Sequence, residues 1–291
     1  MAGGQFEPRV SEARAHLSAC DLCPRRCGVD RIRGERGVCR AGHQALLASY
    51  GPHFGEEPPL VGQHGSGTIF LAGCNLKCSF CQNYEISHGA QGREVSVQDM
   101  ASAMANLAEI GCHNINFVTP THFAPQILEA ILVAAGQGLG IPIVYNCGGY
   151  ESVEMLRLLE GAVDIYMPDF KFWRESSARR YLGAPDYPES ARAAIREMHR
   201  QVGDLVVRDG VAERGLLVRH LVMPGSLEET EQILRFLADE ISPMTFVNVM
   251  DQYRPCHRAG ESPEIARRLT ADEHKRALEI ASMVGLARVC S

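Results

Sequence analysis

From residue 67 onward, short apolar runs alternate with segments whose apolar residues recur at helical spacing. Six runs predict β-strands, at residues 68–72, 114–118, 141–145, 163–167, 216–223 and 245–249. Nearly all of these runs are continuous rather than alternating, which is typical of strands that are buried on both faces. The sequence therefore predicts six buried strands, each followed by a helical segment.

One segment illustrates this helical spacing. Its apolar residues fall at positions i, i+3, i+4, i+7, i+10 and i+11: Val97, Met100, Ala101, Met104, Leu107 and Ala108. Two further helices are predicted to start with capping boxes, at residues 226–229 and 270–273. Repeated strand–helix units give a parallel α/β sheet with right-handed crossovers, and a doubly wound sheet or a barrel would both satisfy this pattern.

The chain has 291 residues, 45% of them hydrophobic, which is enough for one large α/β domain and a small appendage. We place a Cys-rich segment at residues 1–66 and the core domain at residues 67–291. The formal net charge of −6 argues against a nucleic-acid partner. Six arginines between residues 25 and 40 form a local basic segment, which we interpret as a solvated, partly ion-paired face rather than a polyanion site.

No apolar run approaches the ~20 residues that cross a bilayer, and residues 1–7 lack the apolar core of a signal peptide. These features predict a cytoplasmic protein with no membrane partner. In that reducing compartment, the eleven cysteines indicate metal ligands and buried thiols rather than disulfides.

The sequence Cys74-Asn75-Leu76-Lys77-Cys78-Ser79-Phe80-Cys81 places three thiols within eight residues, directly after the first predicted strand. Thiolates suit iron–sulfur clusters, and a cluster with three protein ligands keeps one iron free to bind a small molecule. A structural zinc site usually has four protein ligands in paired knuckles, so this spacing disfavours zinc. Buried thiols without a metal are the remaining alternative.

This segment resembles the CxxxCxΦC signature of the radical S-adenosylmethionine (SAM) superfamily, with Phe80 as the aromatic residue. The resemblance implies a partial (β/α)6 TIM-like barrel in which Cys74, Cys78 and Cys81 hold a [4Fe-4S] cluster. It also implies that SAM chelates the fourth iron and is cleaved reductively to a 5′-deoxyadenosyl radical, which abstracts hydrogen. The electron would come from a donor such as flavodoxin or ferredoxin, and the backbone near Phe80 would face the adenine of SAM.

The ends of the next two predicted strands carry polar groups. Thr119 and Thr121 stand where related activating enzymes have a Gly-Gly-Glu segment that contacts the SAM amino group, so their hydroxyls or backbone carbonyls would take over that contact. Asn146 follows the third strand, before two glycines that let the backbone approach a ligand. We expect all three residues to bind SAM.

Strands four and five add charged groups. Asp169 and Lys171 resemble the Asp-x-Lys of pyruvate formate-lyase-activating enzymes, and Arg219 lies in a strand similar to one in those enzymes. The resemblance implies that these residues lie near the SAM carboxylate, which an arginine can bind through two hydrogen bonds. A surface ion pair between Asp169 and Lys171 is the structural alternative.

The sixth strand ends differently from that of the activating enzymes, and this departure leaves the substrate open. The chain resembles an uncharacterised, activator-like group, whose substrate could be a glycyl-radical protein or a small molecule. Gln252, Tyr253 and Arg254 offer hydrogen bonds and a positive charge to a small molecule. A non-catalytic iron–sulfur electron carrier or metal sensor is the alternative function, and cleavage of SAM by the reduced protein would separate the two.

A second group of cysteines lies near the N-terminus, in a segment rich in glycine and arginine. A segment this short buries little core and often needs a metal to fold. Its four thiols suit either zinc or an auxiliary iron–sulfur cluster: Cys20, Cys23, Cys27 and Cys39. Cys147 is interpreted as a buried thiol, and we expect it to face the SAM-binding end of the barrel.

Overall fold

The computed structural model describes residues 7–291, and within them ten strands form one curved sheet in the order β10-β9-β8-β6-β5-β4-β2-β1-β3, with β7 paired to β8. All six predicted strands are present: β2 (Ser66–Leu71), β4 (Ile115–Val118), β5 (Ile143–Cys147), β6 (Ile165–Pro168), β8 (Val211–Leu221) and β9 (Phe246–Met250). Neighbours among these six pair in parallel. The predicted α/β partial barrel is confirmed.

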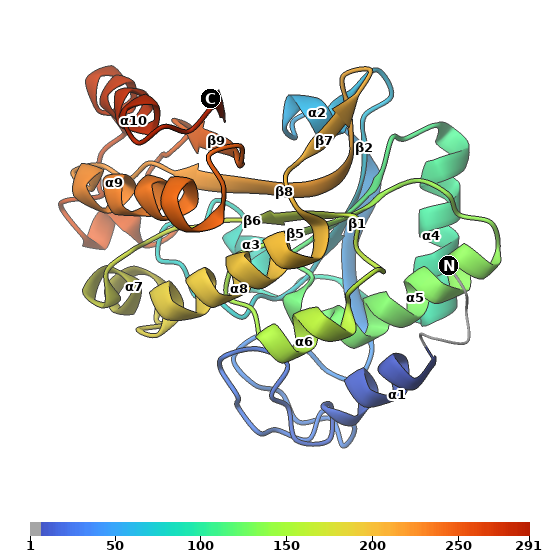
Figure 1. Ribbon diagram of the computed structural model, residues 1–291. Helices are drawn as coiled ribbons and strands as arrows, with labels where there is room; N and C mark the ends of the chain where they lie inside the picture. The colour runs from blue at the N-terminus through green and yellow to red at the C-terminus, as the bar shows by residue number, and fades with distance from the viewer. Residues whose placement is uncertain (1–6) are drawn as a thin grey trace.

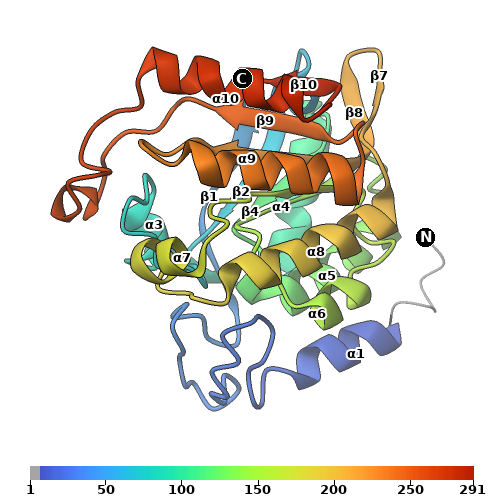
Figure 2. The same ribbon diagram turned by 60° about the vertical axis from the view of Figure 1, so that its left-hand side comes forward.

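Helices follow the strands and pack around the outside of the curved sheet (Figures 1 and 2). They are α4 (Val97–Ile110), α5 (Ala124–Gly136), α6 (Val153–Leu158), α7 (Glu175–Leu182), α8 (Tyr187–Val202), α9 (Leu227–Phe236) and α10 (Ala271–Met283). Every residue of β5 is buried, as the continuous apolar pattern predicts. In the described part of the chain, no helix is long and apolar enough to cross a membrane. The prediction that there is no signal peptide used residues 1–7, and residues 1–6 lie outside the described residues.

The N-terminal segment packs against the core and also contributes to its sheet. Helix α1 (Glu7–Ala15) lies on α5 and α6, at the foot of the barrel in Figure 1. Strand β1 (Ala45–His53) pairs antiparallel with β2 and with β3 (Arg93–Val95). The two short helices α2 (Pro58–Val61) and α3 (Tyr84–Ser87) lie in the loops that flank β2. The boundary between residues 66 and 67 stays a prediction.

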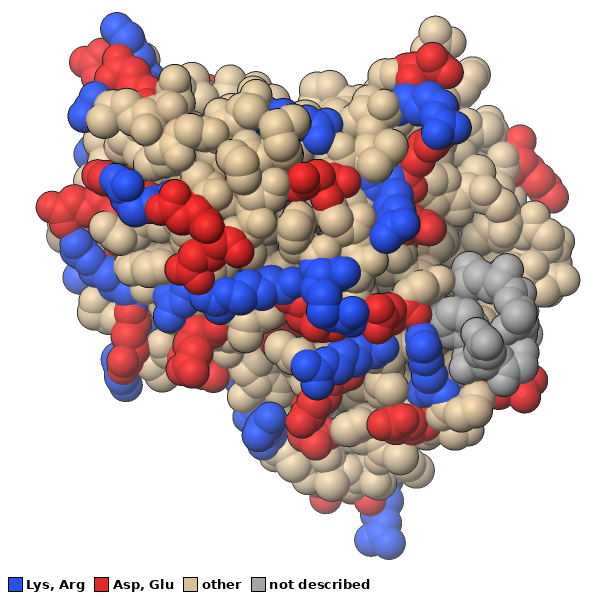
Figure 3. Space-filling model, in the orientation of Figure 1, with Lys and Arg blue, Asp and Glu red and all other residues tan. Residues whose placement is uncertain are grey.

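One arginine of the basic segment is buried and a second is half-buried, which corrects the interpretation of a solvated face for these two. Arg31 is 1% exposed, and its guanidinium donates to the carbonyls of Gly42 and His122. Arg25 donates to the carbonyls of Asn75 and Gly183. Backbone carbonyls from several segments therefore hold Arg31 inside the fold and fix Arg25 partly buried. On the face drawn in Figure 3, Lys and Arg alternate with Asp and Glu.

The two predicted capping boxes have different outcomes. At α10, the Thr270 hydroxyl accepts from the Glu273 N–H, and the Glu273 carboxylate accepts from the Thr270 N–H, so this box is confirmed. At α9, the Ser226 side chain makes no capping bond, so this prediction is wrong. The buried Glu229 carboxylate instead accepts from the N–H groups of Trp173 and Arg174, just before α7. Two donors from another segment therefore take the carboxylate that a local capping box would use.

Candidate active site

A cavity of about 440 Å³ opens at the carboxyl ends of the six parallel strands. Each strand contributes lining residues, among them Cys74 after β2, Thr119 after β4, Asn146 in β5, Asp169 after β6, Arg219 in β8 and Met250 in β9. In a barrel of parallel strands, the loops of this end come together from every strand, and active sites concentrate there. The cavity is therefore the candidate active site.

All three cysteines of the CxxxCxΦC motif line this cavity. Cys78 is buried, Cys74 and Cys81 are half-buried, and none of the three forms a disulfide. Within residues 7–291, no three His, Cys, Asp or Glu side chains converge on a point that would hold a single metal ion. A cubane cluster does not need such a point, because each thiolate binds a different iron. The donor set of three unpaired thiols on one loop thus fits a [4Fe-4S] cluster.

Burial governs the protonation of these thiols. It raises the pKa of Cys74 to about 11 and raises the pKa of Cys78 as well. The motif thiols Cys74 and Cys78 are therefore protonated at neutral pH without iron, and iron must displace their protons on binding. Cluster assembly should consequently become easier as the pH rises.

Three charged side chains and one amide form a hydrogen-bonded group in the wall of the same cavity. The continued pairing of β6 and β8 sets Asp169 beside Arg219. Asp169 Oδ2 lies 2.5 Å from Lys171 Nζ, and Asp169 Oδ1 lies 2.8 Å from Arg219 Nε. Arg219 Nη2 also donates to Asn146 Oδ1 at 2.7 Å. All four residues line the cavity, so the predicted Asp169–Lys171 pair is not a surface pair.

This group stays charged although it is largely buried. Burial by itself raises the pKa of Asp169, but Arg219 and Lys171 reverse this and hold that pKa below its usual range. Burial likewise lowers the pKa of Lys171, and the Asp169 carboxylate outweighs it, so that the net change is upward. The cavity wall therefore presents a fixed carboxylate between two fixed cations at neutral pH.

Glu56, in the loop between β1 and α2, also lines the cavity and was missed by the sequence analysis. Its carboxylate lies 3.8 Å from Arg219 Nη1, as does that of the neighbouring Glu57. Burial raises the pKa of Glu56, and Arg219 only partly compensates. No motif marks this residue, because it lies in a loop after strand β1, which the apolar pattern did not reveal. His53, 3.6 Å from Glu56, lines the cavity as well.

The two threonines after β4 diverge. Thr119 lines the cavity and has a positive φ of 60°, a left-handed conformation that turns the chain sharply. Thr121 does not reach the cavity, because it begins the turn η2 (Thr121–Phe123), where its hydroxyl donates to Glu151 Oε1 at 2.6 Å. The expectation that both threonines face SAM is thus corrected for Thr121, whose hydroxyl serves a buried carboxylate.

Only some of the remaining predicted residues line the cavity. Phe80 lines the cavity with its ring edge toward Phe172, and Cys147 is buried and lines it as expected. Of the three residues after β9 considered for a small molecule, Gln252 lines the cavity. Tyr253 turns into the core, where its hydroxyl donates to the Ile265 carbonyl, and Arg254 does not contribute to the lining.

The four N-terminal cysteines line a small hollow directly beneath the motif loop, together with Arg31, Asn75 and His122. Three of these thiols are buried and Cys27 is exposed. The Cys39 carbonyl packs so closely on Gly73, the residue before the motif, that an added Cβ there would lie 2.5 Å from it. The two cysteine groups are therefore neighbours, while the metal at Cys20, Cys23, Cys27 and Cys39 stays a prediction.

Comparison with known proteins decides the family. The family model of the radical SAM superfamily matches residues 68–237, which contain the cysteine motif and five of the six parallel strands. The chain belongs to the radical SAM superfamily. Two proteins of Methanocaldococcus jannaschii are similar along most of their length. The uncharacterized protein MJ0674 is 35% identical over 287 residues, 96% of this chain and 78% of its own. The uncharacterized protein MJ0808 is 22% identical and covers 91% of this radical SAM chain.

Two solved structures share the fold. Methylornithine synthase (PylB) superposes with a TM-score of 0.51 and 16% identity, over 76% of this chain and 63% of its own. A radical SAM methyltransferase from Sphaerobacter thermophilus gives a TM-score of 0.52 and 16% identity, over 77% of this chain and 65% of its own. This chain thus spans just under two thirds of each. At 16% identity, this similarity supports the barrel fold but gives no information about the substrate.

Members of the radical SAM superfamily use a [4Fe-4S] cluster and SAM, so the predicted cofactors are confirmed at the level of the family. The prediction of an enzyme is confirmed at the same level. The activating-enzyme-like subgroup and the individual site residues stay predictions. The second metal site at the N-terminal cysteines also stays a prediction.

Proposed function

We propose that this protein is a radical SAM enzyme in which Cys74, Cys78 and Cys81 hold the [4Fe-4S] cluster. When bound, the cluster and SAM supply a 5′-deoxyadenosyl radical that abstracts hydrogen from a substrate. One observation carries the proposal: the three motif thiols line the same cavity as the Asp169–Lys171–Arg219 group, at the end of the barrel where all six strands meet.

The charged group provides a cradle for the zwitterionic end of SAM. Asp169, held anionic by its two cations, can accept a hydrogen bond from an ammonium group. Lys171 and the unused N–H groups of Arg219 can donate to a carboxylate, and Thr119 and Asn146 lie beside them in the lining. The backbone at Phe80 is the proposed contact for the adenine. An iron–sulfur carrier would need none of these groups, which disfavours the non-catalytic alternative.

For the substrate, we infer a small molecule rather than the backbone of a glycyl-radical protein. The segment from β1 to α2 places His53 and Glu56 in the cavity lining, so the space left beside SAM is bounded by polar side chains. Pockets of about 300–1,000 Å³ with a few placed polar groups are typical small-molecule sites. A glycyl-radical enzyme, which the activator-like resemblance also suggests, would have to insert a loop past these residues.

The test is anaerobic reconstitution with iron and sulfide, reduction by dithionite, and chromatographic detection of 5′-deoxyadenosine after addition of SAM. The Cys78→Ala variant should lose the product. The matched control is Cys112→Ala, which removes a buried thiol that does not line the cavity. A wild-type cluster that never yields 5′-deoxyadenosine would contradict the proposal, as would cleavage that survives in Cys78→Ala.

The same assay tests the reductant. We propose a low-potential electron carrier such as flavodoxin or ferredoxin as the physiological donor, in line with the general need of radical SAM enzymes for one. Replacing dithionite by reduced flavodoxin or reduced ferredoxin should support cleavage. Cleavage with dithionite but with neither carrier would refute this choice of partner.

A further inference from the structure

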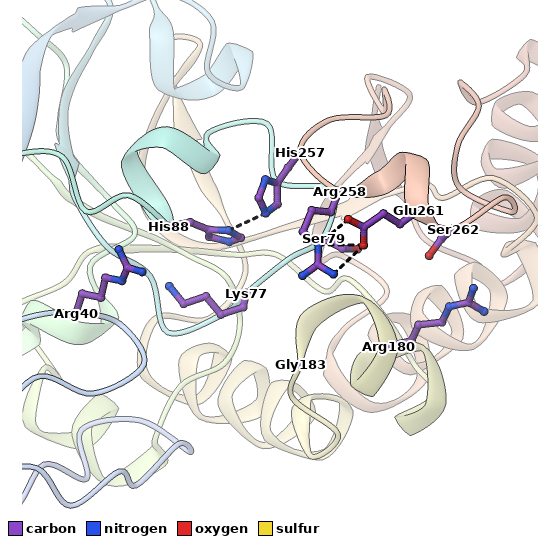
Figure 4. A pocket seen from close by; sticks show the side chains of 10 residues that line it. All are labelled: Arg40, Lys77, Ser79, His88, Arg180, Gly183, His257, Arg258, Glu261 and Ser262. Carbon is purple, nitrogen blue, oxygen red and sulfur yellow. Dashed lines mark hydrogen bonds and ion pairs between the residues drawn. The ribbon is translucent and has the colours of Figure 1, made fainter.

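A second hollow, of about 480 Å³, lies on the other side of the segment that carries the motif cysteines (Figure 4). Lys77, Ser79 and His88 of that segment line it, whereas Cys78 and Cys81 line the active-site cavity. One stretch of chain thus forms the wall between the two spaces. We call this second hollow the basic pocket, because arginine, lysine and histidine dominate its lining: Arg40, Lys77, His88, Arg180, His257 and Arg258.

The charges of the basic pocket are only partly balanced. Arg258 pairs with Glu261 at 2.7 Å, and Arg180 pairs with Glu264. Arg40 and Lys77 have no carboxylate partner among residues 7–291. Figure 4 shows the Lys77 nitrogen directed toward Arg40, beneath the His88–His257 pair. Arg40 and Lys77 therefore have no carboxylate to balance them in the described part of the chain.

Two polar atoms of the wall are buried and lack a hydrogen-bond partner in the described part of the chain, Lys77 Nζ and Ser79 Oγ. Leaving such donors unpaired costs the full desolvation of each group. A lining with unpaired donors of this kind is expected where a ligand supplies the acceptors.

A pair of histidines also lines the basic pocket, and His88 adds a donor rather than a charge. His88 Nδ1 lies 3.2 Å from His257 Nε2, and the Tyr84 ring stacks on His257 at 4.9 Å. Burial, with Lys77 and His257 nearby, lowers the pKa of His88 to about 4, so that His88 is neutral at physiological pH. His88 therefore adds nothing to the positive charge that the arginines and Lys77 bring to the pocket.

We propose that the basic pocket binds the phosphate group of a small molecule. A phosphate monoester carries about −1.5 to −2 charges at neutral pH, which matches the two unbalanced cations. Its terminal oxygens suit the planar fork of Arg40 and the point charge of Lys77, and the hydroxyl of Ser79 lines the same pocket. The bound phosphate would contact the back of the loop that carries Cys78, without entering the active-site cavity.

The test is isothermal titration of the cluster-loaded protein with inorganic phosphate and with pyrophosphate, at low and at high salt. We expect saturable binding that weakens as salt is added, because the contacts are between charges. Arg40→Gln should weaken binding about tenfold or more, since it removes a charge-assisted contact from a side chain that lies outside the cavity. Ser79→Ala should weaken it less, because it removes a neutral donor.

The matched control is Arg276→Gln, an exposed arginine of α10 that pairs with Glu279 and should bind both probes as the wild type does. Iron content, measured for every variant, verifies that the cluster is retained. Binding that is equal in wild type and Arg40→Gln overturns the proposal. Absence of saturable binding up to millimolar phosphate or pyrophosphate also overturns it, and favours an acidic protein surface as the occupant. No outcome depends on SAM cleavage, so failure here is distinguishable from failure of the proposed function.

Discussion

Glu151 should make the stability of this protein depend on pH in a way that one substitution removes. Its carboxyl is 4% exposed and lies behind the wall of the active-site cavity. Thr121 donates to Oε1 at 2.6 Å, and the Tyr145 hydroxyl donates to Oε2 at 3.2 Å. No cation pairs with it in the described part of the chain, so hydrogen bonds alone stabilise its charged form. The Glu151→Gln variant keeps the size of the side chain and cannot ionise.

The magnitude follows from the pKa of this carboxyl. Burial raises the pKa of Glu151 to about 7, against 4.5 for the ordinary value, and the hydrogen bonds reduce this effect without cancelling it. Below about pH 4.5, Glu151 is protonated in both the folded and the unfolded chain. Between about pH 4.5 and pH 7, the folded chain keeps a proton that the unfolded chain loses, so stability falls as the pH rises. At about 1.4 kcal/mol for each pKa unit, the loss above pH 7 reaches about 3 kcal/mol.

The assay is urea denaturation of the metal-free, reduced protein at several pH values across this range. Subtracting the free energy of unfolding of wild type from that of Glu151→Gln cancels every other titration. The difference should rise by about 3 kcal/mol from the acid end to the alkaline end. Thr121→Val, which removes one donor to the carboxylate, should displace the wild-type transition to higher pH. A difference that stays flat across the range would refute the reasoning.

Three further predictions concern the cluster, SAM and the helix caps. Replacing all three motif cysteines by alanine should remove about four irons per chain in an iron assay and spare any N-terminal metal, and an unchanged iron count would exclude them as ligands. Lys171→Met should weaken SAM binding by about 1–3 kcal/mol in a titration, because a charge-assisted contact is lost, whereas Thr121→Val should bind SAM as the wild type does. Thr270→Ala should lower the free energy of unfolding by about 1 kcal/mol through the lost cap, whereas Ser226→Ala should change it little, and equal effects would contradict the structure.

The strands could be predicted from the sequence because burial on both faces leaves continuous apolar runs. The predicted ends of the strands were less accurate, because a proline or a hairpin turn decides where a strand begins. The strand predicted from residue 141 begins at Ile143, after Pro142, which has no N–H for the sheet. The strand predicted from residue 216 begins at Val211, because it forms a hairpin with β7 (Val206–Arg208). The turn, Asp209-Gly210, has positive φ at both residues and was a readable hairpin signal.

The site was predictable where it depends on strand ends. The cysteine motif and the Asp169–Lys171 pair follow parallel strands directly, so the sequence order of the strands brings them to one edge. The prediction that Thr121 faces SAM was wrong because the chain turns sharply after Thr119. The direction of a side chain beyond a turn cannot be derived from residue spacing. Glu56 was missed as a cavity residue because it follows the N-terminal strand β1. That strand pairs antiparallel with β2, so it leaves no strand–helix pattern in the sequence.

Glu56 also bears on the charge that the cavity offers to its cofactor. Around Arg219 stand the carboxyl groups of Asp169, Glu56 and Glu57, and Lys171 is the second cation of this group. The burial that raises the pKa of Glu56 favours its neutral form. This shift reduces the negative charge that Glu56 sets against the two cations of the wall. A zwitterion such as the methionine end of SAM brings one ammonium and one carboxylate to this wall, so its binding adds no net charge to the cavity.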